Sequence, residues 1–143
     1  ASKRCRKFAK KILPGFRANQ IVTVSNTVKT FITLKAHISD TDILACCVRE
    51  DKCGNGCGGG NVENAFNWVV KNGVCTGGRY KEKDVCKPYP FYPCGQHGNQ
   101  TYYGPCPEYG FSAPKCRRKC QLRYSVPYEN DLVYGEFTRE KAY

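Results

Sequence analysis

Cysteine density is the feature that most constrains how this chain can fold. Its 143 residues include eleven cysteines, and all of them except Cys5 lie from position 46 to position 120. Crosslinks at this density are typical of oxidising compartments, so we expect a location outside the cytosol. Zinc sites usually space cysteines about two to four residues apart and often add histidine. Here an adjacent Cys46–Cys47 pair is followed by gaps of five and three residues with no histidine near. The spacing therefore favours disulfides over a metal site, and no cofactor is expected.

Positive charge is concentrated in the first part of the chain. Residues 1–39 contain nine Lys or Arg and no acidic residue, whereas the other residues contain fourteen basic and twelve acidic side chains. Such a block suits contact with heparin-like polymers, anionic lipid or nucleic acid, and it equally suits a solvated, disordered arm. Only Phe8 and Phe16 are aromatic within residues 1–19, so a base-stacking surface for specific nucleic-acid recognition is not indicated.

Two helices are expected in the middle of the chain. The first follows Ser39, whose hydroxyl can accept from the backbone of Asp42, and it ends near Cys46 with acidic residues at the positive end of its dipole. The second follows Asn61 and ends at Gly73, because glycine readily takes the left-handed conformation at a helix C-terminus. Trp68 is expected beside the apolar stripe of this helix, at the edge of the core. The residues of the stripe have helical spacing: Val62, Ala65, Phe66, Val69 and Val70.

The remaining segments carry weaker structural signals. Residues 20–36 are rich in β-branched side chains, which suit strands, but the alternation is imperfect and the assignment stays open. Residues 74–134 contain seven prolines and six cysteines, which indicates loops shaped by crosslinks. Each such crosslink stabilises a fold by about 2–4 kcal/mol.

Few side chains suggest chemistry on their own. The histidines are His37 and His97, and neither is flanked by residues that would orient it as a base, so a Cys–His dyad within the chain is not expected. Asn99 begins an Asn-Gln-Thr acceptor sequence for N-glycosylation in an expected loop. A second basic cluster, residues 115–119, is either a solvated surface turn or a polyanion contact.

Several cysteine-containing segments together resemble the papain family of cysteine peptidases, in particular its cathepsin B-like members of the invertebrate, helminth type. The most specific part is residues 39–47, followed by Cys-Gly-Asn-Gly-Cys-Gly-Gly-Gly at residues 53–60. The similarity covers about residues 37–135, and so many cysteines in register make a chance match a poor explanation. The other matching segments are Ala65–Trp68, Gly73–Gly78, Cys86–Tyr89, Pro93–His97, Cys106, Ala113–Cys116 and Cys120.

The resemblance implies an α+β fold: the left, helical domain of a papain-like protein, disulfide-rich, with an occluding loop at residues 94–106 and with the second, β-rich domain missing. It implies a substrate-binding role for Gly59 and Gly60, where an extended peptide can lie against exposed main chain. Gln96 and His97 stand where the family has two adjacent histidines that hold the C-terminal carboxylate of a substrate, so one cationic donor is absent. The implied disulfides are Cys46–Cys116, Cys47–Cys53, Cys86–Cys120 and Cys94–Cys106.

The catalytic residues of the family are not found in this sequence. The nucleophile position falls at Gly15, the oxyanion-stabilising glutamine falls at Ala9, and no Cys-Trp pair occurs anywhere. The family's catalytic His and Asn, which belong to the second domain, have no counterpart. Because nucleophile, base and oxyanion donors must lie within hydrogen-bond reach, we expect no activity from this chain alone. Cys57 lacks its family partner and has Cys5 as a candidate substitute, with Cys75 as the candidate free thiol.

The sequence therefore divides into a divergent basic segment at residues 1–36, which takes the place of the family's catalytic helix, a cathepsin B-like left domain at 37–135 and a tail at 136–143. The preferred interpretation is a cathepsin B-like cysteine peptidase that is truncated or degenerate, secreted or lysosomal, with peptide or protein substrates and cystatin-like inhibitors as partners. The alternative is a non-catalytic secreted protein that binds peptides, inhibitors or polyanions. The absence of methionine and the start at Ala1 suit a processed chain or a fragment, and no apolar stretch suits a transmembrane segment.

Overall fold

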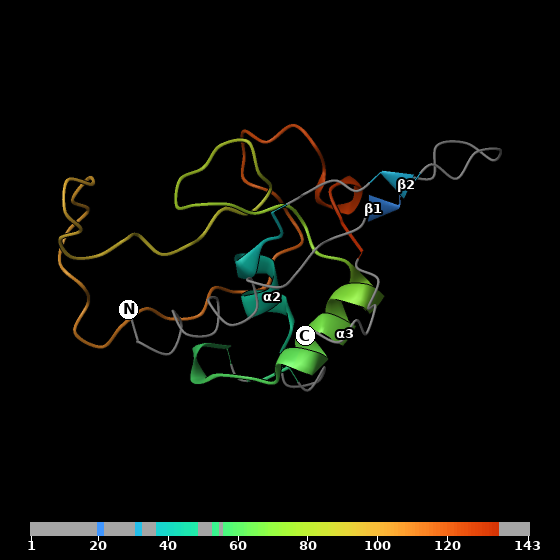
Figure 1. Ribbon diagram of the computed structural model, residues 1–143, viewed down its shortest axis with the longest axis horizontal. Coiled ribbons are helices and arrows are strands. Elements are labelled where there is room, and N and C mark those ends of the chain that lie inside the picture. The colour runs from blue at the N-terminus through green and yellow to red at the C-terminus, as the bar shows by residue number, and fades with distance from the viewer. Residues whose placement is uncertain (1–19, 22–30, 33–36, 49–52, 55, 135–143) are drawn as a thin grey trace, which may run out of the picture.

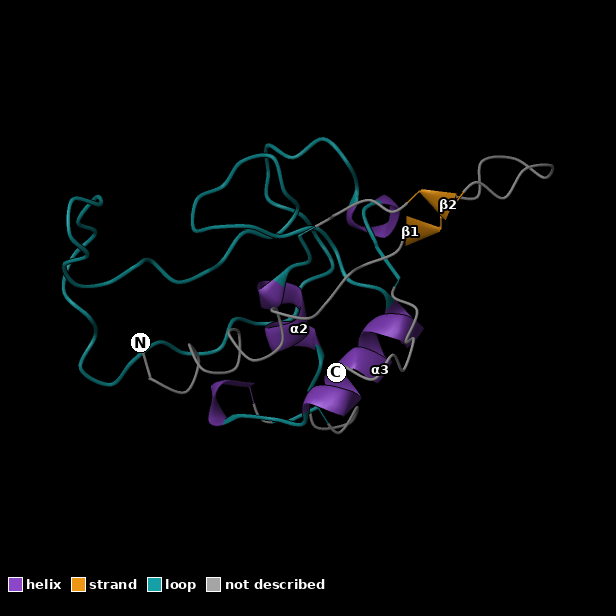
Figure 2. Ribbon diagram, viewed as in Figure 1, coloured by secondary structure: helices purple, strands orange, loops and turns teal. Residues whose placement is uncertain are grey.

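Two helices, a very short sheet and long loops make up the part of the chain that the structure describes. The computed structural model describes residues 20–21, 31–32, 37–48, 53–54 and 56–134. Long loops occupy most of the chain after α3, as Figure 2 shows. The elements in chain order are β1 (Gln20–Ile21), β2 (Phe31–Ile32), α2 (Asp40–Cys46), the 3₁₀ turn η2 (Gly56–Gly58), α3 (Val62–Asn72) and the 3₁₀ turn η3 (Tyr128–Asn130).

The two strands lie within the β-branched segment at residues 20–36. β1 and β2 pair antiparallel, with Gln20 opposite Ile32 and Ile21 opposite Phe31. The open assignment of this segment thus becomes strand for these four residues, and the residues between them lie outside the described part. Figure 1 shows the strand pair to one side of the helices.

Helix α2 begins where the sequence predicts. The Ser39 hydroxyl accepts a hydrogen bond from the backbone N–H of Asp42 at 3.1 Å, which satisfies one of the N–H groups that every helix start leaves unpaired. At the other end the N–H of Cys47 donates to Ile43 O at 3.0 Å. Ile43 and Leu44 are buried, so the helix packs its apolar side into the core and delivers the cysteine pair at its end.

Helix α3 also has the expected ends, and four residues of its expected stripe face the core: Ala65 and Val69 are buried, and Val62 and Phe66 pack against the core while partly buried. The Asn61 side chain accepts from the Asn64 N–H at 3.0 Å, and Gly73 ends the helix with a φ of 74°. Trp68, expected at the edge of the core, is buried, whereas Val70 is 39% exposed. The correction has a physical reason: the large Trp68 ring removes more apolar surface from water than Val70 does, so the helix turns its ring side inward. The buried residues are Ala65, Trp68 and Val69.

The main core lies between the two helices and the chain that follows α3. Short backbone bridges bring distant segments to this core, because Ile38 pairs with Thr76 and Val74 pairs with Val133. The second bridge has N–H···O distances of 2.9 and 2.8 Å and fixes the chain beyond η3 against the end of α3. The buried members of the core are Ile38, Ile43, Cys47, Cys53, Ala65, Trp68, Val69, Val74 and Val133.

Disulfides brace the loops that this core does not reach. The described residues contain the same four pairs that the family resemblance implies: Cys46–Cys116, Cys47–Cys53, Cys86–Cys120 and Cys94–Cys106. Cys75 is a buried free thiol. Cys57 is disulfide-bonded as well, and its candidate partner Cys5 lies outside the described residues.

The division of the chain at residues 36 and 135 stays a prediction, because most of residues 1–36 and all of the tail at 136–143 lie outside the described part. Among the described helices, none combines the length and apolar character that crossing a membrane requires.

Candidate functional site

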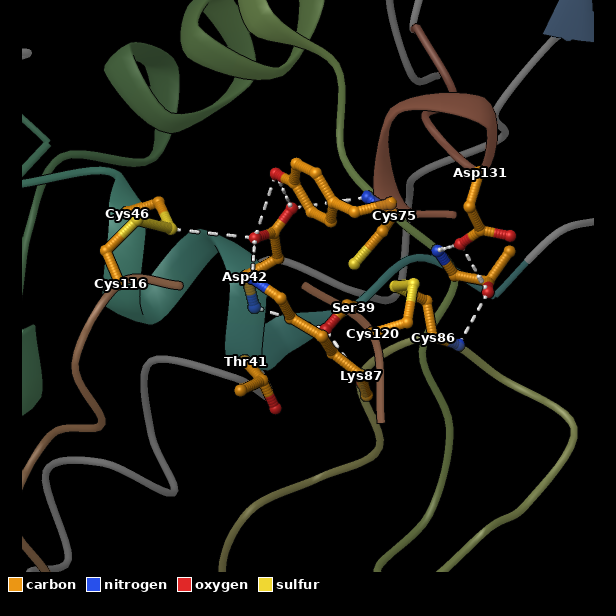
Figure 3. Close-up of polar contacts among 12 residues, drawn as sticks. Ser39, Thr41, Asp42, Cys46, Cys75, Cys86, Lys87, Cys116, Cys120 and Asp131 are labelled. Carbon is orange, nitrogen blue, oxygen red and sulfur yellow. Dashed lines mark hydrogen bonds and ion pairs between the residues drawn. A yellow bond between two sulfur atoms is a disulfide. The ribbon is translucent and has the colours of Figure 1, made fainter. Parts of the chain in front are cut away.

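A buried carboxylate, Asp42, lies at the centre of the described chain. Its Oδ1 is 2.6 Å from the ammonium Nζ of Lys87, and its Oδ2 accepts from the backbone N–H of Cys75 at 3.2 Å. The Tyr128 hydroxyl lies 3.2 Å from Oδ1 and 3.0 Å from Oδ2. Asp42, Cys75 and Lys87 converge in Figure 3 from α2 and from the loop that follows α3. One side chain therefore joins three segments that are far apart in the sequence.

The start of α2 is held against the same loop by hydroxyl groups. Ser39 Oγ donates to Lys87 O at 2.8 Å, and Thr41 Oγ1 donates to Pro88 O at 2.8 Å. Gly77 lies so close to Ser39 that a Cβ on this glycine would collide with the Ser39 backbone. A residue without a side chain at position 77 is thus required for the helix to dock.

The sulfur of Cys46 also faces Asp42, and Figure 3 marks this contact. Cys46 Sγ lies 3.6 Å from Asp42 Oδ1. Because Cys46 is bonded to Cys116, it has no S–H proton to donate, so the contact is one of packing and not a hydrogen bond.

A second carboxylate, Asp131, holds the neighbouring loop. Its Oδ2 accepts from both the backbone N–H and the hydroxyl of Thr76 at 2.7 Å, and its Oδ1 accepts from the Tyr124 hydroxyl at 2.6 Å. Cys75, Cys86 and Asp131 place their sulfur and oxygen atoms within 4.8 Å of one another. Cys86 is bonded to Cys120 and offers no thiolate, so this group does not have the donors of a metal centre.

Burial sets the protonation of the groups around Asp42. Burial raises the pKa of the Cys75 thiol above its ordinary value, and the charge of Asp42 raises it further. Cys75 therefore stays a protonated thiol at neutral pH and is not a nucleophile in the folded chain. Burial also raises the pKa of Asp40 to about 7, so this helix-start carboxyl is largely neutral in acid.

Replacing Asp42 with Asn is expected to lower the free energy of unfolding by about 3–5 kcal/mol, because the change leaves the Lys87 ammonium buried without its counter-charge. Chemical denaturation followed by the fluorescence of Trp68 measures this loss. Asp84→Asn makes the same change on an exposed carboxyl and is expected to stay within about 0.5 kcal/mol of the parent chain. Similar losses in both variants would contradict the central role of Asp42.

The glycine-rich loop before α3 exposes its main chain. Gly54 and Gly60 form an antiparallel bridge, and the adjacent Asn61 N–H donates to Cys53 O at 2.7 Å. Because bonded and non-bonded pairs alternate in an antiparallel ladder, the N–H and C=O of Gly60 point away from Gly54. Gly60 is exposed, and Gly59 has a φ of 106°, a conformation that favours glycine. The loop thus presents an outward main-chain edge at Gly60.

The loop from Cys94 to Cys106 is closed at its base and extends away from the helices (Figure 1). Beside the disulfide, the Gly95 N–H donates to Gly104 O at 2.8 Å, and the Tyr92 hydroxyl donates to Pro105 O at 3.0 Å. These three connections join the two ends of the loop to each other.

The two polar residues predicted to meet substrate in this loop bind the backbone of the loop itself. Gln96 Nε2 donates to Gly98 O at 2.8 Å, and His97 Nε2 lies 2.8 Å from Cys94 O, to which it donates. Both residues are exposed, and so is Asn99 in the turn that follows.

An aromatic clasp that the sequence did not suggest joins this loop to the turn after α3. The rings of Tyr80 and Tyr103 meet edge to face with centroids 5.3 Å apart. Lys81 Nζ lies 5.7 and 5.6 Å from the two ring centres, within the range of cation–π attraction. Because the two tyrosines lie 23 positions apart in the sequence, no local pattern could have predicted the contact.

Tyr103→Ala is expected to release the loop and to speed its cleavage by an added protease several-fold, because the clasp contributes about 1 kcal/mol or more. Limited proteolysis with mass spectrometry of the cut sites measures this. Tyr102→Ala is the matched control, since Tyr102 is 57% exposed and outside the described clasp. If the Tyr102 variant is cut as fast as the Tyr103 variant, the clasp does not hold the loop.

Comparison with known proteins gives the class of this chain. Residues 15–142 match the family described as papain family cysteine protease. The chain therefore belongs to the papain family, and the papain-like fold expected from the sequence is confirmed. Its relatives are cathepsin B-like: cathepsin B-like cysteine proteinase 1 of Haemonchus contortus is 45% identical over 102 residues, covering 71% of this chain and 29% of the relative.

Another sequence relative gives the same picture. Cathepsin B-like cysteine proteinase 1 of Ostertagia ostertagi is 43% identical over 106 residues, with 74% of this chain and 28% of the relative covered. Among solved structures, proCathepsin B S9 from Trypanosoma congolense is 25% identical with a TM-score of 0.44, covering 73% of this chain and 25% of that chain. The chain thus spans less than a third of the length of these relatives.

Proposed function

We propose that this chain forms the substrate-docking, left-hand part of a cathepsin B-like cysteine peptidase. The observation that carries this proposal is the outward main-chain edge at Gly60. An edge of this kind pairs with an extended backbone and is indifferent to side chains, so peptide and protein segments are the ligands that it fits. Gly59 beside it adds no side chain that would obstruct such a ligand.

The chain by itself is proposed to be catalytically silent. Its sequence contains no Cys-Trp pair, and Gly15, at the position of the nucleophile, lies outside the described residues. Cys75 is buried and its thiol pKa is raised, so it does not replace the missing nucleophile. Peptide-bond hydrolysis would then need catalytic groups from outside these residues.

The purified chain is therefore expected to release no product from dipeptidyl or fluorogenic peptide substrates over hours of incubation with a reducing agent. The assay includes papain as a positive control and an epoxide inhibitor of cysteine peptidases. Turnover that needs thiol and that the epoxide blocks would overturn the proposal of silence, and Cys75→Ser would then report whether Cys75 is responsible.

Peptide docking is tested separately with an extended, uncleaved peptide immobilised on a sensor. Gly60→Leu is expected to weaken binding at least tenfold, because the new side chain covers the outward main-chain edge. Asn67→Leu adds the same side chain on the exposed side of α3 and is expected to leave binding within about twofold. Equal binding by both variants would refute docking at Gly60, whatever the result of the activity assay.

Non-catalytic capture of peptides or cystatin-like inhibitors is the second candidate function. The Gly60 edge supports it equally, because main-chain pairing needs no nucleophile. Retention of the chain on immobilised cystatin, lost in Gly60→Leu and kept in Asn67→Leu, would favour capture by this edge over an inert fragment.

The remaining expectations are proposals of the same kind. Residues 94–106 are proposed to act as the occluding loop, with His97 as its remaining cationic donor. Gln96 carries no charge with which to hold a substrate carboxylate, so we do not propose that this loop supports removal of dipeptides. Exposed Asn99 is proposed to carry an N-glycan, consistent with a secreted or lysosomal location. Contact of the basic N-terminal segment with polyanions lies outside the described residues and stays a prediction.

A further inference from the structure

A basic segment at residues 115–119 lies on the surface around Cys116 and directly before Cys120, both of which are disulfide-bonded. Lys115, Arg117, Arg118 and Lys119 are all exposed. Residues 109–128 contain these four cations and Arg123 but no acidic residue. The positive charge of this stretch is therefore not diluted by carboxylates along the chain.

The backbone of this segment is fixed at both ends. Cys116 is bonded to Cys46 at the end of α2, and Cys120 is bonded to the buried Cys86. Gln121, the next residue, donates its backbone N–H to Cys86 O at 2.9 Å. Its side-chain Nε2 lies 2.6 Å from Val85 O and also contacts the carbonyl oxygens of Glu82 and Lys83 at 2.9 and 3.1 Å.

The four cations have no described carboxylate partner. The ion pair found within the described part of the chain is Lys87–Asp42, which is buried and includes none of these four cations. Glu82 contacts Gln121 through its backbone carbonyl oxygen, whereas its exposed carboxylate accepts from the backbone N–H of Arg79. Within the described residues, the basic segment thus presents exposed cations that no ion pair holds.

We propose that residues 115–119 bind a sulfated polysaccharide. Regularly spaced sulfate groups match several cations on a short segment, and the fixed backbone loses little conformational freedom on binding. Residues 112–123 contain no aromatic side chain on which a base could stack, and they form no helix that could lie on a membrane. This site is independent of the peptide-docking function at Gly60.

The test compares two triple variants of the whole chain with the same net charge. The site variant is Lys115→Gln with Arg117→Gln and Lys119→Gln. The control is Lys71→Gln with Arg139→Gln and Lys141→Gln, which removes one cation from α3 and two from the tail at 136–143. Arg118 stays in both, because its charge acts on the buried Tyr128, whose pKa is raised chiefly by burial. Circular dichroism and denaturation midpoints verify that both variants fold.

Binding to heparin is measured by titration at several salt concentrations. The site variant is expected to bind at least tenfold more weakly. The magnitude of the slope of log affinity against log salt is expected to fall by about two to three, because binding releases fewer counterions when three cations are missing. The control is expected to change affinity by less than about threefold. Equal losses in both variants would show a response to net charge alone and overturn the site, as would an unchanged affinity in the site variant.

Two further probes separate the source of the anionic groups. Heparin stripped of its sulfates but keeping its carboxylates is expected to bind the parent chain at least tenfold more weakly than heparin. The affinity for phosphatidylserine vesicles and for single-stranded DNA is expected to be less than threefold lower in the site variant than in the parent chain. Vesicles or DNA that depend on residues 115–119 as strongly as heparin does would overturn the assignment to a sulfated polysaccharide.

Discussion

The ion pair between Asp42 and Lys87 is the interaction on which the rest of the described structure depends. A buried charge is tolerated only with a partner and further hydrogen bonds, and here Cys75 N–H and the Tyr128 hydroxyl complete the shell of the carboxylate. One carboxylate thus joins helix α2 to the loop after α3 and to η3. The Ser39 hydroxyl adds a second link at the start of α2, since it donates to the carbonyl oxygen of Lys87 at 2.8 Å.

Disulfides extend this arrangement to chain that has little apolar material of its own. Outside the main core, burial is limited to small clusters, such as Leu44 with Phe91. Cys46–Cys116 and Cys86–Cys120 connect the polar centre to the last loop of the described chain. Stability in this half of the molecule therefore comes from a few specific links, which explains how the candidate binding surfaces can lie on loops and still be well defined.

Local signals in the sequence predicted the elements that depend on neighbouring residues. The ends of α2 and α3 followed from caps at Ser39 and Asn61, because a cap acts within one helical turn. The predicted core face of α3 was wrong only at Val70, which is exposed, and at Trp68, which is buried and not at the core edge, since burial depends on what the helix meets. The buried role of Asp42 was missed because its partner Lys87 lies 45 positions away in the sequence. An acidic residue in the first turn of a helix is also common on exposed helices, so the local sequence does not distinguish the two cases. Disulfide pairs came from the family resemblance, since spacing alone leaves many pairings open.

The Cys94–Cys106 link has a consequence for how this part of the protein can change over evolutionary time. Because the ends of the loop are bonded to each other, insertions and deletions between Gly95 and Tyr102 leave both the base and the Tyr103 clasp in place, and the entropy of closing a loop grows only slowly with its length. Related proteins can lengthen or shorten this segment, or change its amino acids, while the supporting fold stays the same. Diversity between paralogues is therefore expected to accumulate there first.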